Sequence, residues 1–101
     1  MVKVILNYKG VETEIQCNLN EKIKDIFKRY SNKVEVDISK VYFIYNGNKI
    51  DDNNLILNGI INEEDKRRNI MNILVNIIII KLDNNCIFIL IFFKIYKYNK
   101  L

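Results

Sequence analysis

The order of regular segments in the first half of the chain most constrains what it can fold into. Between Asn20 and Ser31, apolar residues recur at i, i+3, i+4 and i+7, which predicts an amphipathic helix. A strand pattern at 41–45 follows, and Asn46-Gly47 after it is a strong hairpin-turn signal. Because the apolar stripe of a helix must be buried on another layer, we expect this helix to pack on a sheet. The stripe consists of Ile23, Ile26, Phe27 and Tyr30.

Two strands are expected before the helix, at 2–8 and 11–17, because apolar and polar residues alternate in both. Lys9-Gly10 between them predicts a tight turn, since glycine readily takes a positive φ. The two segments therefore predict an antiparallel hairpin with one face toward the core. The side chains expected on that face are Val2, Val4, Leu6, Val11, Thr13, Ile15 and Cys17.

The ends of the helix also have sequence signals. Asn18 and Asn20 are candidate N-caps, and Glu21 stands three residues after Asn18, as in a capping box. We expect the helix to end at Ser31-Asn32-Lys33. The connector that follows should cover the base of the core with Val34, Val36 and Ile38.

The second half of the chain alternates between short strands and loops. In the strand 41–45, Val41, Phe43 and Tyr45 should face the core, and Tyr42 and Ile44 should face away. After it we expect a short strand at Lys49-Ile50 and a solvated turn at 51–54. Leu55, Leu57 and Ile60 are expected to fill the core from a loop, and the charged segment 62–69 should be an exposed loop. A final strand is predicted from Ile70, with Met71, Ile73 and Val75 facing the core.

Composition argues against several functions. Residues 1–76 hold twelve Lys and Arg against eleven Asp and Glu, so this part offers no electrostatic footprint for nucleic acid. The chain has no histidine and no glycine-rich phosphate loop, and neither Cys17 nor Cys86 has a base partner nearby in sequence. We therefore expect no enzyme activity, no catalytic residue, no cofactor and no metal site. The two cysteines are interpreted as small apolar core residues without a disulfide, and no secretory leader is recognised.

The patterning breaks down after residue 76, which divides the chain into a domain at 1–76 and an apolar, lysine-flanked extension at 77–101. Eight apolar residues, Cys86–Phe93, would span only ~12 Å as a helix, against ~30 Å of membrane hydrocarbon. Three interpretations stay open: a membrane anchor, an extra strand pair docked on the domain or a partner, and the remnant of a longer protein.

Residues 2–76 resemble the ubiquitin-like β-grasp domain in the order of their segments. The most specific piece runs from Tyr42 to Ile50 and resembles the strand-turn-strand segment of that family, and Ile23–Ile26 resembles the start of the family helix. The resemblance implies an α+β fold in which a mixed four- or five-stranded sheet packs on one amphipathic helix. It also implies that the first and last strands pair in parallel.

The resemblance further implies a site on the open face of the sheet. Ile44 and Leu74 match the apolar patch by which family members are recognised, and Tyr42 and Lys49 would rim it. Tyr8 or Asn7 falls at the hairpin-loop position. Conjugating members end in Gly-Gly, whereas this chain continues with Asn76 and four isoleucines, so covalent attachment is not expected.

The expected function is therefore a non-catalytic module that binds ubiquitin-recognition domains or proteasome-type receptors. We expect a monomer in the cytoplasm, with the nucleus as a second location. The alternatives are an adaptor tethered to a membrane by the extension, and a fragment of a larger ubiquitin-domain protein.

Overall fold

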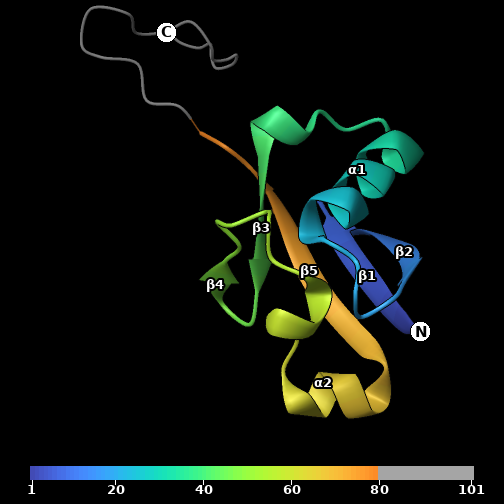
Figure 1. Cartoon of the computed structure of the whole chain (residues 1–101). Helices are drawn as coiled ribbons and strands as arrows, with labels where there is room; N and C mark the ends of the chain where they lie inside the picture. The colour runs from blue at the N-terminus through green and yellow to red at the C-terminus, as the bar shows by residue number, and fades with distance from the viewer. Residues whose placement is uncertain (80–101) are drawn as a thin grey trace, which may run out of the picture.

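A mixed sheet with one long helix across one face organises the chain (Figure 1). The structure is a computed structural model that describes residues 1–79. In chain order the elements are β1 (Val2–Tyr8), β2 (Val11–Cys17), α1 (Ile23–Val34), β3 (Val41–Tyr45), β4 (Asn48–Lys49), α2 (Glu63–Arg68) and β5 (Ile70–Ile77), with short 3₁₀ turns at Ile38–Lys40 and Leu57–Gly59. The α+β class and the single amphipathic helix on the sheet confirm the predicted fold.

The last strand lies at the centre of the sheet, whose order is β2-β1-β5-β3-β4. β5 runs parallel to β1, and it runs antiparallel to β3 on its other side. The predicted parallel pairing of the first and last strands is therefore confirmed. A parallel pair needs a long crossover, and α1 lies within it.

The core forms between α1 and the face of the sheet beneath it. All four residues of the predicted helix stripe are buried there, as are alternate residues of β1, β3 and β5. The ring of Phe27 stacks on that of Phe43 with centroids 3.6 Å apart, and Tyr30 meets Phe43 edge-on at 6.2 Å. These aromatic contacts fix α1 over β3. The connector residues Val34, Val36 and Ile38 pack against the core as predicted.

Both predicted tight turns are present, with consecutive residues at positive φ. Lys9 and Gly10 have φ of 54° and 84°, and Asn46 and Gly47 have φ of 53° and 78°. This arrangement matches the two-residue hairpin turn whose twist suits antiparallel strands.

Two residues expected in the core are exposed. Val11 is 66% exposed because it lies at the tip of the hairpin, and Leu55 is 40% exposed in the loop before the 3₁₀ turn at Leu57–Gly59. Thr13 is half-buried, so the core on β2 begins at Ile15. The short strand β4 starts one residue earlier than predicted, at Asn48.

The start of α1 also differs from the prediction. The Glu21 carboxylate accepts from the Asn18 amide at 2.7 Å, as the predicted capping box requires, but the helix begins later. Its N-cap is Lys22, whose side chain makes no capping bond. Instead the amide of Ile23 donates to the Leu55 carbonyl at 2.8 Å, and the amide of Lys24 donates to the Asn53 carbonyl at 3.1 Å. The loop thus satisfies groups that a side chain usually caps. At the other end, α1 continues to Val34 and closes with Glu35 at φ 58°.

The segment predicted as a charged loop at 62–69 contains a helix. In α2, the side chain of Asn62 accepts from the amide of Asp65 at 2.8 Å, and Asn69 closes the helix in the left-handed conformation. Acidic residues occupy its first turn and basic residues its last, which favours helix through the dipole.

Strand β5 continues to Ile77, and the amide of Ile78 still donates to the Lys40 carbonyl at 2.9 Å. Regular pairing thus extends one residue past the predicted domain boundary at 76. The rest of the predicted extension, residues 80–101, lies outside the described residues, together with Cys86. Among residues 1–79, neither helix has the length and apolar character that a membrane span requires.

Candidate protein-binding face

The face of the sheet that points away from α1 carries one residue from every strand in a single row. The register places Lys49 beside Ile44, Ile44 beside Leu74, Leu74 beside Asn7, and Asn7 beside Glu12. We call this line the outer row; it runs from β4 across β3, β5 and β1 to β2. Its members are Lys49, Ile44, Leu74, Asn7 and Glu12.

The centre of the outer row is apolar. Ile44 and Leu74 are direct cross-strand partners, so their side chains lie next to each other on the same face. Leu74 is 45% exposed and Ile44 is half-buried. The sequence prediction that these two residues point outward from neighbouring strands is confirmed. Their role in binding stays a prediction.

Tyr42 and Lys49 lie beside this centre as the resemblance implied. The ammonium nitrogen of Lys49 lies 5.3 Å from the centre of the Tyr42 ring, within the range of a cation–π contact. Asn76, the cross-strand partner of Tyr42, donates to its hydroxyl at a long 3.5 Å. Both contacts hold the Tyr42 ring alongside the apolar centre.

Tyr8 is placed differently from the other four predicted site residues. Side chains of a strand alternate between its two faces, so Tyr8 lies on the same face as Val4 and Leu6. It therefore points to the helix side of the sheet and packs against the core. Asn7 is the residue of this strand that stands next to Leu74. Of the two residues expected at the hairpin-loop position, Asn7 therefore lies on the outer face and Tyr8 on the helix side, because the alternation of β1 sends neighbouring side chains to opposite sides. Tyr8 still lines a hollow that Leu74 also borders, and its role in binding stays a prediction.

Two shallow hollows flank Leu74. One, of about 440 Å³, includes Tyr42, Asn76 and the Lys9-Gly10 turn in its wall. The other, of about 410 Å³, includes Ile5, Ile44 and Glu12. Leu74 and Asn7 line both, so Leu74 forms the ridge between them. Such relief on an apolar surface can receive side chains of a docked segment.

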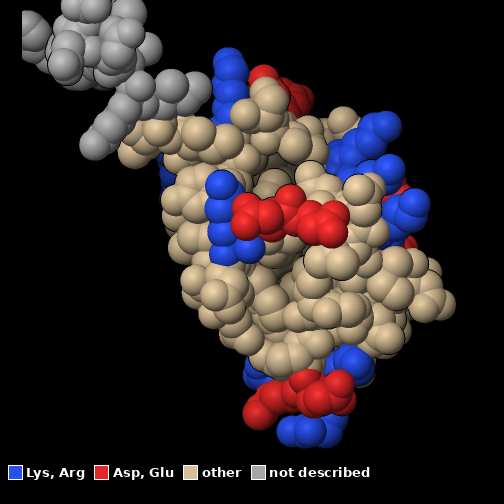
Figure 2. All heavy atoms as spheres, turned by 60° about the vertical axis from the view of Figure 1, so that its left-hand side comes forward, with Lys and Arg blue, Asp and Glu red and all other residues tan. Residues whose placement is uncertain are grey.

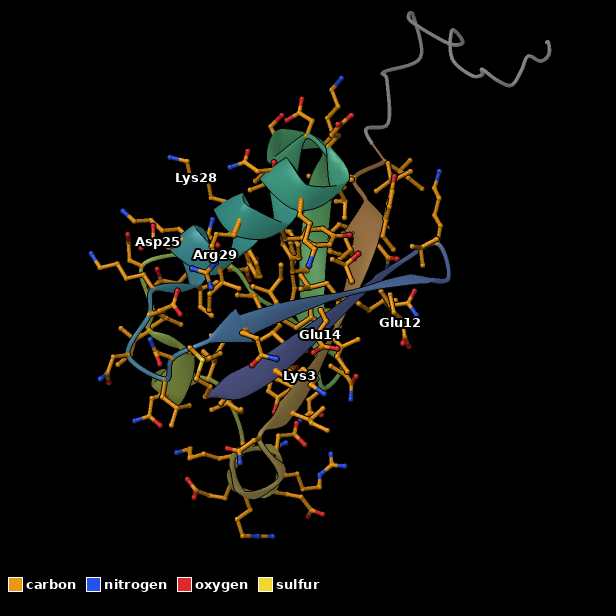
Figure 3. The ribbon with its side chains drawn as sticks, turned by 90° about the vertical axis from the view of Figure 1, so that its right-hand side faces the viewer. Lys3, Glu12, Glu14, Asp25, Lys28 and Arg29 are labelled. Atoms are coloured by element: carbon orange, nitrogen blue, oxygen red, sulfur yellow. The ribbon has the colours of Figure 1, made fainter. Side chains whose placement is uncertain are left out.

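Charges occur at the two ends of the outer row. Lys49 stands at the β4 end, and its nearest carboxylate is that of Asp51 at 3.8 Å. At the β2 end, Figure 3 shows Glu12, Glu14 and Lys3 on the side of the hairpin away from α1. Glu14 pairs with Lys3 at 3.6 Å. Within residues 1–79, Glu12 makes no ion pair.

Arg29 and Lys33 close the outer edge of β2 from the helix side. Arg29 donates to the Gln16 carbonyl at 3.1 Å, and Lys33 donates to the Glu14 carbonyl at 3.0 Å. Arg29 also pairs with Glu21, which raises the pKa of Arg29 and lowers that of Glu21. These contacts join residues far apart in the chain, so no local sequence pattern indicates them.

A polar cluster at the α2 end was also missed. Asp65 is only 9% exposed; it accepts from the Tyr45 hydroxyl at 2.6 Å and from Arg68 at 2.8 Å. The amide of Asn62 donates to the same hydroxyl at 3.0 Å. Figure 2 shows acidic and basic side chains gathered at this end of the molecule. The cluster ties α2 to β3.

The Tyr45 hydroxyl, the Arg68 guanidinium and the Asn62 amide serve as hydrogen-bond donors within this cluster. Within the described range 1–79, no three His, Cys, Asp or Glu side chains gather as metal ligands would. The buried thiol of Cys17 has a pKa raised to about 11, mainly by burial, so it is protonated at neutral pH.

Comparisons with known proteins agree with this fold. A family model described as "Ubiquitin-2 like Rad60 SUMO-like" matches residues 2–66. No curated protein matches the chain.

Three solved structures show the same fold at low sequence identity. The solution NMR structure of the ubiquitin-like domain of Arabidopsis thaliana At2g32350 is 16% identical, has a TM-score of 0.64, and is matched over 78% of this chain and 79% of that one. A structure of the same protein from evolutionary couplings and sparse NMR data is 14% identical, with a TM-score of 0.61 over 82% and 93%. The crystal structure of AtBAG1 in complex with HSP70 is 12% identical, with a TM-score of 0.59 over 74% of this chain and 39% of that chain.

Proposed function

The chain belongs to the ubiquitin-2 like Rad60 SUMO-like family, and on that premise we propose that it is a non-catalytic module that binds other proteins through its outer row. The partners are domains that recognise ubiquitin-like folds, including receptors of the degradation machinery. Binding is non-covalent. The module acts as a monomeric adaptor in the ubiquitin pathway, in the cytoplasm and, as a second location, the nucleus.

The observation that carries this proposal is the direct pairing of Ile44 with Leu74 on the face away from α1. A partner that covers these two neighbouring apolar side chains and the shallow hollows beside them removes apolar surface from water, which favours binding. The polar residues around them form the rim of such an interface. The AtBAG1 structure, which is a complex with HSP70, is an example of a protein with this fold bound to another protein. AtBAG1 is longer than the matched region, so its partner is not transferred to this chain.

The sequence after the last strand supports the non-covalent mode. Conjugation through an adenylate and a thioester needs an unhindered carboxylate on a C-terminal glycine. In this chain β5 ends with Asn76-Ile77, and Ile78 and Ile79 follow it in place of glycines. β-branched side chains at these positions would clash in a channel shaped for two glycines.

A titration with ubiquitin-recognition domains tests the proposal. The ¹⁵N-labelled chain is titrated with a ubiquitin-associated domain, a ubiquitin-interacting helix and a proteasomal receptor domain, and amide shifts are followed. Shifts should cluster on β3, β5 and the Lys9-Gly10 turn. The double variant Ile44→Ala/Leu74→Ala should weaken binding at least about tenfold, since loss of a central apolar contact costs on the order of 1–2 kcal/mol.

Leu55→Ala/Ile56→Ala is the matched control, because both residues are exposed and apolar, and neither belongs to the outer row or lies next to the Lys9-Gly10 turn. It should leave the affinity unchanged. The proposal is wrong if none of the three domains perturbs the outer row, or if both double variants weaken binding equally. Thermal unfolding of each variant shows whether a loss of binding reflects a loss of folding.

A further inference from the structure

The outer row has opposite charges at its two ends. Lys49 supplies a cation at the β4 end, and Glu12 supplies a carboxylate at the β2 end, with Glu14 next to it along the same strand. The Lys49 side chain is 57% exposed, and its contact with Asp51 is long and solvated, so the cation stays available to a partner. Glu14 forms an ion pair with Lys3, whereas Glu12 makes no ion pair within residues 1–79.

The spacing of the strands sets the distance between these charges. The row crosses five strands, and neighbouring strands lie about 4.8 Å apart, so its ends are separated by roughly 19 Å. A helix rises about 1.5 Å per residue, so roughly 13 residues span the row. A partner that satisfies both ends must therefore carry its complementary charges about three and a half helical turns apart.

The centre of the row suggests how such a segment is seated. Leu74 forms a ridge between two hollows that share it as a wall. On an amphipathic helix, apolar side chains one turn apart lie on the same face, about 5–6 Å from each other. The two hollows lie on either side of Leu74 along the strands, so a helix that crosses the strands over Leu74 would fill them from the two edges of its apolar stripe, one on the side of Tyr42 and the other on the side of Ile44.

We infer that the outer row selects an amphipathic helix that is acidic at one end, apolar in the middle and basic at the other end. The helix lies across the strands, with its acidic end at Lys49 and its basic end at Glu12 and Glu14. The inference rests on the proposed function and adds to it the charge layout of the partner. A helix with acidic residues at both ends would place carboxylates against Glu12, which opposes its binding.

Three synthetic peptides of 18 residues test this inference. They share a leucine-rich apolar stripe and differ only in their charges: two Glu at one end and two Lys at the other, two Glu at both ends, or two Lys at both ends. Binding to the full chain is measured by fluorescence anisotropy at low and at high salt. The peptide with opposite charges should bind about 3- to 10-fold more tightly than the other two at low salt. Salt should reduce the difference.

A charge change at the β2 end provides the decisive comparison. Glu12→Lys/Glu14→Lys makes both ends of the row basic, so the preference should move to the peptide with Glu at both ends. Glu63→Lys/Glu64→Lys is the matched control, because it changes the net charge equally on the exposed surface of α2. The control should keep the preference of the wild-type chain.

The outcomes separate this inference from the proposed function. Equal shifts of preference in the two charge variants, or equal binding of the three peptides, overturn the charge layout and leave binding by the outer row intact. If neither the peptides nor the ubiquitin-interacting helix binds while the ubiquitin-associated domain or the proteasomal receptor domain does, the isolated helix is the wrong partner and the proposed function stands. If the ubiquitin-recognition domains also fail to bind, both are refuted.

Discussion

Asp65 is the one charged side chain that the described part of the chain buries. A buried carboxylate is costly unless hydrogen bonds satisfy it, and Asp65 has donors from the Tyr45 hydroxyl and from Arg68. The bond from Tyr45, followed by that from Arg68, holds the pKa of Asp65 below its usual value of 3.8, although burial opposes them. Burial raises the pKa of the Tyr45 hydroxyl, and its bond to Asp65 adds to this rise.

Replacing Asp65 should therefore destabilise the protein in a pH-dependent way. A carboxyl whose folded pKa is depressed adds stability above its unfolded pKa and loses it as pH falls below about 3.8. Asp65→Asn should lower the free energy of unfolding by about 1–3 kcal/mol at pH 7. Its deficit relative to the wild type should shrink toward pH 2. Urea unfolding at pH 7, 4 and 2 measures both effects.

Glu63→Gln is the control for this prediction, since Glu63 is exposed on the same helix. A constant deficit of Asp65→Asn at all three pH values would show that the carboxylate is not stabilised by its partners. A Glu63→Gln variant with the same deficit at pH 7 would assign the effect to α2 in general.

At the residue scale, the sequence predicted faces well and the ends of elements poorly. Ile44 and Leu74 were placed outward because alternation along a strand has a period of two, and this period holds throughout β3 and β5. The alternation also placed Val11 inward, but it contains no information on how far the helix covers the hairpin. The resemblance to a family left Tyr8 and Asn7 open at the hairpin-loop position, and the alternation along β1 places Asn7 beside Leu74 and Tyr8 on the core side.

The outer edge of β2 is the element most exposed to unwanted pairing. An edge strand presents unpaired backbone groups, and proteins protect such edges with charged side chains. Here Arg29 and Lys33 of α1 donate to the carbonyls of Gln16 and Glu14, which removes two acceptors that another strand would use. The two cations therefore protect the edge as well as joining α1 to β2.

Removing both cations should promote self-association. Arg29→Met/Lys33→Met keeps most of the length of each side chain but leaves two carbonyls unbonded, and it should lower the free energy of unfolding by about 1–3 kcal/mol. Light scattering and size-exclusion chromatography should detect larger species of the variant than of the wild type at the same concentration. Lys24→Met/Lys28→Met, at exposed positions of the same helix, should have little effect. Equal association of the two variants would mean that added hydrophobicity alone is responsible.

The helices show where local sequence signals suffice and where they do not. The stripe of α1 predicted its buried face correctly, because burial repeats with the helical period. Its start was wrong because the carbonyls of Leu55 and Asn53 cap it from a distant loop. In contrast, α2 had adequate local signals: Asn62 as N-cap, three acidic residues in the first turn and three basic residues in the last. Those charges were interpreted as a solvated loop.

The whole molecule is held together by its central strand. β5 has β1 on one side and β3 on the other, and the parallel register with β1 joins six residue pairs, from Lys3–Ile70 to Tyr8–Val75. The two ends of the described chain leave from opposite ends of this parallel pair (Figure 1). A force between them acts along the strands, so it loads the hydrogen bonds of the pair together.

Single-molecule pulling should show this directional resistance. Tethers at Met1 and Ile79 shear β1 against β5, whereas tethers at Met1 and Asn18 open the β1–β2 hairpin from its free end, where Val2 pairs with Cys17. The first geometry should require the higher rupture force at the same loading rate, because its bonds break together rather than in succession. Equal forces in the two geometries would contradict a role for the parallel ladder.

The position of β5 also determines how the chain would meet a processive unfolding motor. A motor that grips the polypeptide beyond Ile79 and translocates it transmits tension first to the innermost strand. Because β5 is not an edge strand, pulling it out must break its hydrogen bonds to both β1 and β3 before any other element unfolds. Such a substrate should stall the motor at the outset and then collapse in a single step.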